Sequence, residues 1–249
     1  MRRALVLIVI LLAALALVAC GKDEGITREA DDEPDAPSVA SESAPPTATA
    51  TTPAPQRSSN DGCRAVAPPE PAAEPDRRPA RRRLHRNRRH TVVITTNCGT
   101  IEIRLDVRRA PKTTAAFAGL VRRKFFDGLT FHRIAKPGGN DYVIQGGDPL
   151  GTGNGGPGYT VVEPPPKNLR YTRYTVAMAK TQTEQPGTSG SQFFIVTARQ
   201  APLEPDYALL GKVIGGKSTV KRIAKVPTDP ATEMPLDPVV MSAVRLRSR

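Results

Sequence analysis

Between residues 91 and 246 the sequence repeats one pattern: a short apolar run of strand-forming residues, then a loop rich in Gly and Pro. Such runs lie at 91–96, 100–105, 129–134, 142–145, 159–162, 176–179, 193–197, 209–214 and 239–246. Asn97-Cys98-Gly99 between the first two runs predicts a tight hairpin. Helical spacing is confined to a stretch opened by Pro111 and to residues 218–223. Many short strands without alternating helices favour a closed antiparallel barrel, because closure removes exposed strand edges.

The first 90 residues differ in composition from the rest of the chain. Between Gly21 and His90 there are eleven Pro and few large apolar residues, so nothing there can offset the entropy of ordering. We therefore predict a disordered tether, rich in Pro, Ala and Arg, over residues 20–90, and one folded domain over residues 91–249. From Thr91 onward 22 basic and 12 acidic residues leave a net charge of +10, most of the +12 of the whole chain.

The N-terminus has the pattern of an export signal. Arg2 and Arg3 precede the uncharged run from Ala4 to Ala19, which as a helix spans about 24 Å, less than the ~30 Å hydrocarbon core of a bilayer. The ending Leu-Val-Ala-Cys resembles a bacterial lipobox, which implies a signal peptide over residues 1–19 and a diacylglycerol on Cys20. We expect an extracytoplasmic protein, lipid-anchored to the bacterial cell membrane. The alternative is a short signal-anchor helix with an incidental Cys.

Eight Arg lie between Arg77 and Arg89, together with Leu84 and His85. Such a run can bind nucleic acid, but an exported chain rarely meets any, so we expect no nucleic-acid partner. Anionic cell-wall polymer or phospholipid headgroups are the better candidates. A solvated linker without any partner is the alternative.

Two cysteines remain once Cys20 is lipidated: Cys63 in the tether and Cys98 at the tip of the first hairpin. In an oxidising compartment an even number of cysteines favours a disulfide. A Cys63–Cys98 bridge would hold the second half of the tether against the domain. Two unpaired thiols are the alternative.

Four separated motifs occur in the domain: Ala110–Thr113, Phe131-His132-Arg133, Gln145–Asp148 and Gly190–Phe194. Their residues, order and spacing resemble the cyclophilin-type peptidyl-prolyl cis-trans isomerases from about Thr91 to Leu246. The resemblance implies a mainly β fold, a closed eight-stranded antiparallel barrel capped by two helices. It also implies rotation of X–Pro bonds, here during the folding of exported or envelope proteins, with proline-containing polypeptides as partners. We expect no cofactor, no metal and a monomer.

The resemblance assigns roles to individual residues. Arg133 is the catalytic guanidinium, and Gln145 is its polar partner, able to hydrogen-bond the substrate carbonyl. The resemblance also implies three kinds of substrate-binding position. The backbone of Ala179 and Lys180 would pair with the substrate, and Gln192 would line an adjoining subsite. The proline pocket would be lined by Tyr142, Val143, Phe194, Leu203 and Tyr207.

The sequence departs from the family pattern at several of these positions. Tyr142 and Val143 stand where the family usually has Phe and Met. The Lys180–Gly190 loop is longer than in the best-known members, which puts the subsite contacts there in doubt. Pro202 precedes Leu203 where cyclosporin-sensitive members carry a Trp, which implies weak cyclosporin affinity.

Elementary chemistry supports the predicted isomerase function. Rotation about an X–Pro bond must overcome amide resonance, a barrier of ~18–20 kcal/mol, but breaks no bond and so needs no nucleophile. A fixed cation such as Arg133 can favour the less conjugated prolyl nitrogen, because a guanidinium is always charged and its donors form a rigid fork. The alternative function is a non-catalytic module of this fold that binds proline-containing segments or anionic cell-wall polymer. Intact Arg133, Gln145 and Phe194 favour catalysis.

Two further features carry no separate chemistry in this interpretation. His132 is the one His after Thr91, so neither a Ser-His-Asp set nor a His-based metal site is expected there, and we predict a hydrogen-bonded structural residue. Gly151–Gly156 matches a dinucleotide-binding fingerprint, but no helix follows to hold a pyrophosphate, so we predict a loop.

Overall fold

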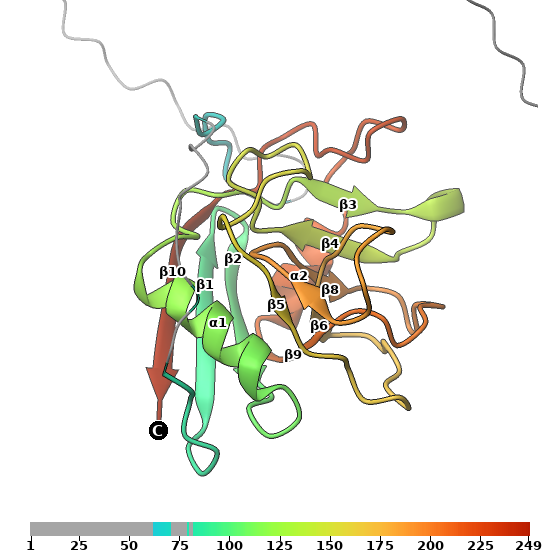
Figure 1. Ribbon diagram of the computed structural model, residues 1–249. Coiled ribbons are helices and arrows are strands. Elements are labelled where there is room, and N and C mark those ends of the chain that lie inside the picture. Colours follow the sequence, from blue (N-terminus) through green and yellow to red (C-terminus); the bar gives the residue numbers. More distant parts are fainter. Residues whose placement is uncertain (1–61, 71–78, 80–81) are drawn as a thin grey trace, which may run out of the picture. The chain divides into compact units, whose positions relative to one another are not determined.

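The computed structural model describes residues 62–70, 79 and 82–249 (Figure 1). The predicted signal peptide, the predicted lipidation site Cys20 and the first part of the Arg run lie outside these residues. None of the helices within the described ranges is long and apolar enough to span a bilayer.

Eight strands form one antiparallel sheet that curls into a half-barrel (Figure 1). From one edge to the other they are β10 (Met241–Ser248), β1 (His90–Thr96), β2 (Gly99–Leu105), β9 (Leu209–Gly215), β6 (Thr175–Met178), β8 (Phe193–Val196), β4 (Val143–Gly146) and β3 (Arg133–Ala135). A separate short ladder joins β5 (Val161–Val162) to β7 (Thr188–Ser189). The predicted hairpin joins β1 to β2, with Thr96 paired to Gly99.

The closed barrel predicted from the sequence is not observed. In the described part of the chain no ladder joins β10 to β3. The segment just before β3 does contact the start of β10, through a bridge between Thr130 and Val240 and through backbone hydrogen bonds such as Met241 N–H to Leu129 O at 2.8 Å. The free edge of β3 is hydrogen-bonded by the segment before β10, because the backbone N–H of Ile134 donates to Glu233 O at 2.9 Å. Because β3 has only three residues, it offers β10 no full ladder, and the two edges meet only through these bonds beside β3.

Two helices pack on the sheet, α1 (Pro111–Arg122) and α2 (Lys217–Ile223), and a 3-10 turn covers Pro137–Gly139. Helix α1 begins at the predicted Pro111, whereas α2 begins one residue before the predicted Ser218. At the start of α1 the carboxylate of Glu163 accepts the backbone N–H groups of Lys112 and Thr113 at 3.0 and 2.7 Å. These groups have no partner within the helix, and an anion is favoured there by the helix dipole.

The main core connects both helices to the sheet. Phe117 of α1 packs against Phe126 and Phe193, with ring centroids 4.7 and 5.5 Å apart. Successive side chains of a strand point to opposite faces. Phe193 therefore faces this core, while Phe194 belongs to a second, smaller apolar cluster beneath the predicted proline pocket.

Several residues on the tether side of the predicted boundary contact the domain. Leu84 is 6% exposed and belongs to the main core. His90 already begins β1, and its ring nitrogens lie 2.8 Å from Ser248 Oγ and 3.0 Å from His85 O. Cys63 is joined to Cys98 by a disulfide.

Replacing Cys63 by Ser is expected to lower the free energy of unfolding by at most about 3–4 kcal/mol, the loop-closure value for this length. The bridge joins residues 35 positions apart, but every strand of the sheet and both helices come after Cys63 in the chain. The domain should therefore still fold and keep its activity. Urea unfolding of the variant and of the wild type, each with and without reductant, measures the effect. Two free thiols at Cys63 and Cys98 in the denatured, unreduced wild type would contradict the prediction.

Candidate active site

A row of hydrogen-bonded side chains begins at Arg133, the first residue of β3. Arg133 pairs with Gln145 across the β3–β4 ladder, and its Nη1 donates to Gln145 Oε1 at 3.3 Å. Gln145 Nε2 donates to Gln192 Oε1 at 2.9 Å, and Gln192 Nε2 donates to the carbonyl oxygens of Gly153 and Gly155 at 2.8 and 2.9 Å. The structure thus brings three predicted site residues into one ordered line whose end is fixed by the Gly-rich loop.

The closest partner of Arg133 is Glu233, which was not predicted from the sequence. The Glu233 carboxylate accepts from Arg133 Nε at 2.7 Å and lies 2.7 Å from Arg133 Nη2. The Arg133 side chain is 39% exposed and that of Glu233 29% exposed. Two nitrogens of the guanidinium are therefore held from one side, and the third faces Gln145.

A tight turn places Glu233. Its φ is +59°, a left-handed backbone conformation that is unusual for a residue with a side chain. The Glu233 N–H donates to Asp229 O at 2.9 Å, and Asp229 Oδ1 accepts the N–H groups of Ala231 and Thr232 at 2.9 and 2.8 Å. The hydrogen bonds to the Asp229 carboxylate, those from Thr232 above all, lower the pKa of Asp229, so the turn keeps its charged acceptor at neutral pH. Asp229-Pro230 in the sequence indicates a turn, but nothing in the sequence indicates that the turn reaches Arg133.

The predicted proline-pocket residues gather in one apolar cluster. Val143 and Phe194 are each 4% exposed, and the partly buried Tyr142, Leu203 and Tyr207 pack against them. The rings of Phe194 and Tyr207 meet edge to face, with centroids 5.4 Å apart.

Tyr171 is a second residue that the sequence analysis missed. It is fully buried in this cluster, where its hydroxyl donates to Tyr207 O at 2.7 Å and accepts Tyr207 N–H at 3.0 Å. Burial raises the pKa of Tyr171 well above its usual range. Burial also raises the pKa of Tyr142, with Tyr207 adding to the effect and Arg133 opposing it. Both phenols are therefore neutral at physiological pH.

A groove of about 500 Å³ is lined by Gln145, by Ala179, Lys180 and Gln192, and by residues 153–160. The Gly-rich segment is thus a loop, as expected from the sequence. The buried carboxylate of Asp148 supports it by accepting the N–H of Leu150 at 2.8 Å. Ala179 N–H donates to Gln192 O at 2.9 Å. This backbone N–H, which was predicted to pair with substrate, is therefore already hydrogen-bonded within the protein.

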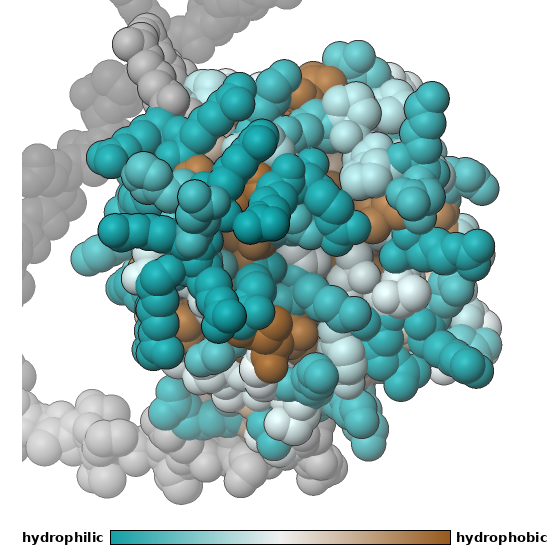
Figure 2. Space-filling view, turned by 90° about the horizontal axis from the view of Figure 1, so that it is seen from below, coloured by the Kyte–Doolittle hydropathy of each residue, from teal (hydrophilic) through white to brown (hydrophobic). Residues whose placement is uncertain are grey.

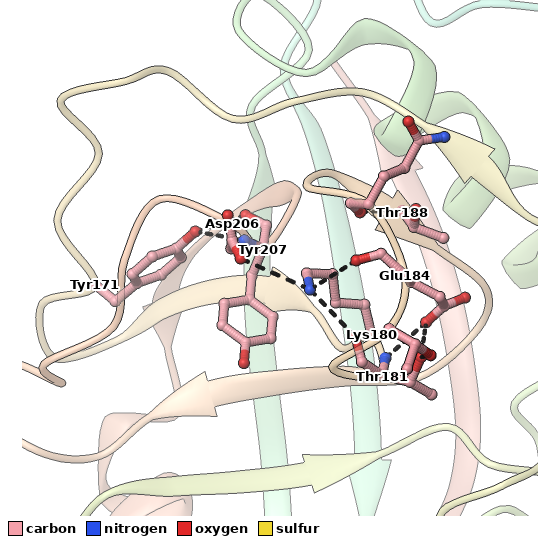
Figure 3. Close-up of polar contacts among 9 residues, drawn as sticks. Tyr171, Lys180, Thr181, Glu184, Thr188, Asp206 and Tyr207 are labelled. Atoms are coloured by element: carbon pink, nitrogen blue, oxygen red, sulfur yellow. Dashed lines mark hydrogen bonds and ion pairs between the residues drawn. The ribbon is translucent and has the colours of Figure 1, made fainter. Parts of the chain in front are cut away.

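The side chain of Lys180 is buried, at 4% exposure, although the resemblance assigned only its backbone to the site. Its ammonium donates to Glu184 O at 3.0 Å and Thr181 O at 3.2 Å, and lies 3.7 Å from an Asp206 carboxylate oxygen (Figure 3). It also lies 5.6 Å from the centroid of the Tyr207 ring. The long Lys180–Gly190 loop is therefore fastened to the pocket wall from within. A charged residue gives no sequence signal for such burial.

His132 is buried beside Arg133, and neither ring nitrogen has a hydrogen-bond partner, which corrects the prediction of a hydrogen-bonded structural residue. Burial lowers the pKa of His132, opposed by Asp148 and assisted by Arg133. The ring is therefore neutral in the folded protein at neutral pH. Within the described ranges no group of three or more His, Cys, Asp or Glu is placed to hold a metal ion.

Comparison with known proteins matches residues 91–246 to the family model described as cyclophilin type peptidyl-prolyl cis-trans isomerase/CLD. The chain is 38% identical over 174 residues to peptidyl-prolyl cis-trans isomerase B of Streptomyces anulatus, covering 63% of this chain and 95% of that protein. It is 37% identical to peptidyl-prolyl cis-trans isomerase A of Mycobacterium tuberculosis, covering 63% and 91%.

Solved structures give the same result. A cyclophilin-type isomerase of Cryptosporidium parvum superposes with a TM-score of 0.58 and 30% identity, covering 65% of this chain and 99% of that one. The same protein, crystallised in the presence of the dipeptide Ala-Pro, superposes with a TM-score of 0.57 and 31% identity, covering 64% and 99%.

Proposed function

Since the chain belongs to the cyclophilin-type peptidyl-prolyl cis-trans isomerases, we propose that it isomerises X–Pro bonds of exported or envelope proteins at the outer surface of a bacterial cell membrane. The isomerase activity follows from the family and from its relatives. The proposed location is supported by the export-signal pattern that ends at Cys20. The same chain has both Arg133 and Gln145, joined by a hydrogen bond.

In the proposed mechanism the chain's own residues lower a rotational barrier and form no covalent intermediate. The apolar cluster around Val143 and Phe194 holds the proline ring. The Arg133 guanidinium donates toward the prolyl nitrogen and so favours its pyramidal, less conjugated form, while Gln145 hydrogen-bonds the substrate carbonyl. Each ~1.36 kcal/mol of preferential transition-state stabilisation gives a tenfold faster reaction.

The partners of the proposed function are proline-containing segments of unfolded or exported polypeptides. A dipeptide Ala-Pro was present in the crystals of one solved relative, and the apolar cluster offers this chain a comparable place for a proline ring. We further propose that residues Arg77–Arg89 contact anionic headgroups or cell-wall polymer, because the Arg side chains of this run are exposed where they are described. The experiment that tests the catalytic part is a protease-coupled isomerisation assay on an Ala-Pro peptide.

The lipid anchor gives a separate prediction. Export of the wild-type chain should leave a membrane-bound product whose N-terminal residue is a lipid-modified Cys20, because the run before it resembles a lipobox. The Cys20→Ser variant should either remain unprocessed or be released into the medium. Fractionation and mass analysis of the N-terminal peptide measure both results. A wild-type product that is wholly soluble and cleaved elsewhere would reject the anchor and leave the isomerase activity unaffected.

A further inference from the structure

One end of the domain carries a continuous cationic face. It combines Arg86, Arg88 and Arg89, which precede β1, with Arg104 of β2, Arg108 of the β2–α1 loop and Lys212 of β9. These residues line a groove of about 760 Å³, and a smaller groove of about 160 Å³ adjoins it and shares Arg89 and Arg104 with it. Figure 2 views the domain from this end and shows long hydrophilic side chains over much of the surface.

The segment before β1 is fixed to the domain, so its charges belong to the same surface. Leu84 inserts into the main core. The backbones of Arg89 and Arg249 exchange two hydrogen bonds, at 2.9 and 3.0 Å, beyond the last registered pair of β1 and β10. The basic run of the sequence and the basic residues of the domain are thus one structural feature, which neither segment forms alone.

The face carries far more positive than negative charge. Eight cationic side chains line the larger groove and two more, Arg247 and Arg249, the smaller. The two grooves are also lined by two side-chain carboxylates, and both are already paired: Asp106 lies 2.7 Å from Arg109, and Glu102 lies 3.9 Å from Arg247. So many like charges within a groove repel one another unless an anion neutralises them, which favours an anionic partner.

An exposed apolar side chain lies among these charges. Ile214 of β9 lines both grooves and is 40% exposed. A soluble polyanion has no apolar region in which an apolar side chain can be buried, whereas a bilayer buries such a side chain at the boundary between headgroups and acyl chains. The combination of cations with a central Ile therefore fits an anionic lipid surface better than a polymer in solution.

We infer that this face, which we call the cationic face, docks the folded domain on anionic phospholipid headgroups. The inference rests on the proposed location at the membrane surface and deepens it, since it assigns the contact to the folded domain as well as to the tether. β3 and β4, which carry Arg133 and Gln145, lie toward the other end of the domain in Figure 1. Docking in this orientation leaves the isomerase site open to polypeptides.

The test compares three double variants of the full chain in its non-lipidated form, each with two fewer positive charges. Arg86→Gln/Arg88→Gln and Arg108→Gln/Lys212→Gln alter the two halves of the cationic face. Lys221→Gln/Lys225→Gln is the matched control, on exposed residues that line neither groove. Co-sedimentation is measured with vesicles of equimolar phosphatidylglycerol and phosphatidylcholine and with vesicles of phosphatidylcholine alone. The ratio of the two partition coefficients cancels any contribution of the apolar N-terminal run.

Each face variant should lower this ratio by about 30-fold, since a cation near an anionic bilayer contributes roughly fivefold to binding. The control variant should change it by only a few-fold. Equal losses in all three variants would show a simple net-charge effect and overturn the inference. The isomerase assay on the same variants should give wild-type rates, so a failure of catalysis and a failure of docking are told apart.

Ile214→Asn separates lipid from soluble polyanion. This variant should weaken partition onto the mixed vesicles several-fold and leave the retention of the chain on immobilised polyphosphate unchanged. If it leaves vesicle binding unchanged, or if soluble polyphosphate binds more tightly than the mixed vesicles, the face serves an anionic polymer and the lipid assignment is wrong.

Discussion

Replacing Arg133 by Ala is expected to lower kcat/KM for an X–Pro peptide by about 10²–10³-fold, the usual cost of removing one fixed donor from a transition state. The fold should be retained. The Arg133 side chain is 39% exposed, and its ion pair with Glu233 is largely at the surface, where such pairs contribute about 1 kcal/mol or less. Protease-coupled kinetics and urea unfolding, made on the same preparation, measure the two effects.

Two comparisons make this result specific. Arg245→Ala removes an equally close surface ion pair, 2.7 Å from Asp127 and remote from the site, and should leave the rate unchanged. Arg133→Lys keeps the charge but loses the rigid fork, so it should restore little activity. A fully active Arg133→Ala enzyme would remove the residue from the mechanism.

The pH dependence follows from the same assignment. Arg does not titrate near neutrality, and the raised pKa values of Tyr142 and Tyr171 keep both phenols neutral. The rate should therefore be nearly flat from about pH 6 to 8. A bell-shaped profile would instead point to an acid–base pair, which the described site does not contain.

The sequence predicted the parts of the site that lie close together along the chain. Arg133 and Gln145 are 12 residues apart on adjacent strands, so a family motif places both at once. The alternation of Phe193 and Phe194 is likewise local, because neighbouring side chains of a strand point to opposite faces. The hairpin at Asn97–Gly99 and the start of α1 at Pro111 were predicted for the same reason: the residues that determine them are contiguous.

The parts that could not be predicted depend on contacts between distant segments. Glu233 lies 100 residues from Arg133, and its place depends on the turn that occupies the open edge of β3. The prediction of a closed barrel is not confirmed for the same reason, since strand propensity does not say whether a loop or a strand will cover the edge of a sheet. Leu84 looked like one apolar residue in a charged linker, and only the folded core shows where it is buried. The burial of Lys180 depends on acceptors in its own loop and at Asp206.

Replacing Glu233 by Ala is expected to lower kcat by about 10- to 100-fold with a smaller effect on KM, because a misplaced catalytic group commonly costs this much. The carboxylate holds Arg133 Nε and Nη2, each at 2.7 Å, and so directs the remaining nitrogen to the Gln145 side. Without it the guanidinium can rotate away, while the apolar cluster that binds the proline ring is untouched. Glu233 is thus a positioning residue, and steady-state kinetics resolve its effect on kcat from that on KM.

Backbone strain must be separated from the loss of the carboxylate, because Glu233 has a φ of +59°. Glu233→Gly removes the carboxylate but suits this conformation, so it should be at least as stable as Glu233→Ala and equally slow. A double-mutant cycle then tests whether Glu233 acts through Arg133: in an Arg133→Ala background, Glu233→Ala should cause no further loss of rate. Additive losses in that cycle, or a Glu233→Gly enzyme with wild-type kcat, would show that the carboxylate does not position the guanidinium.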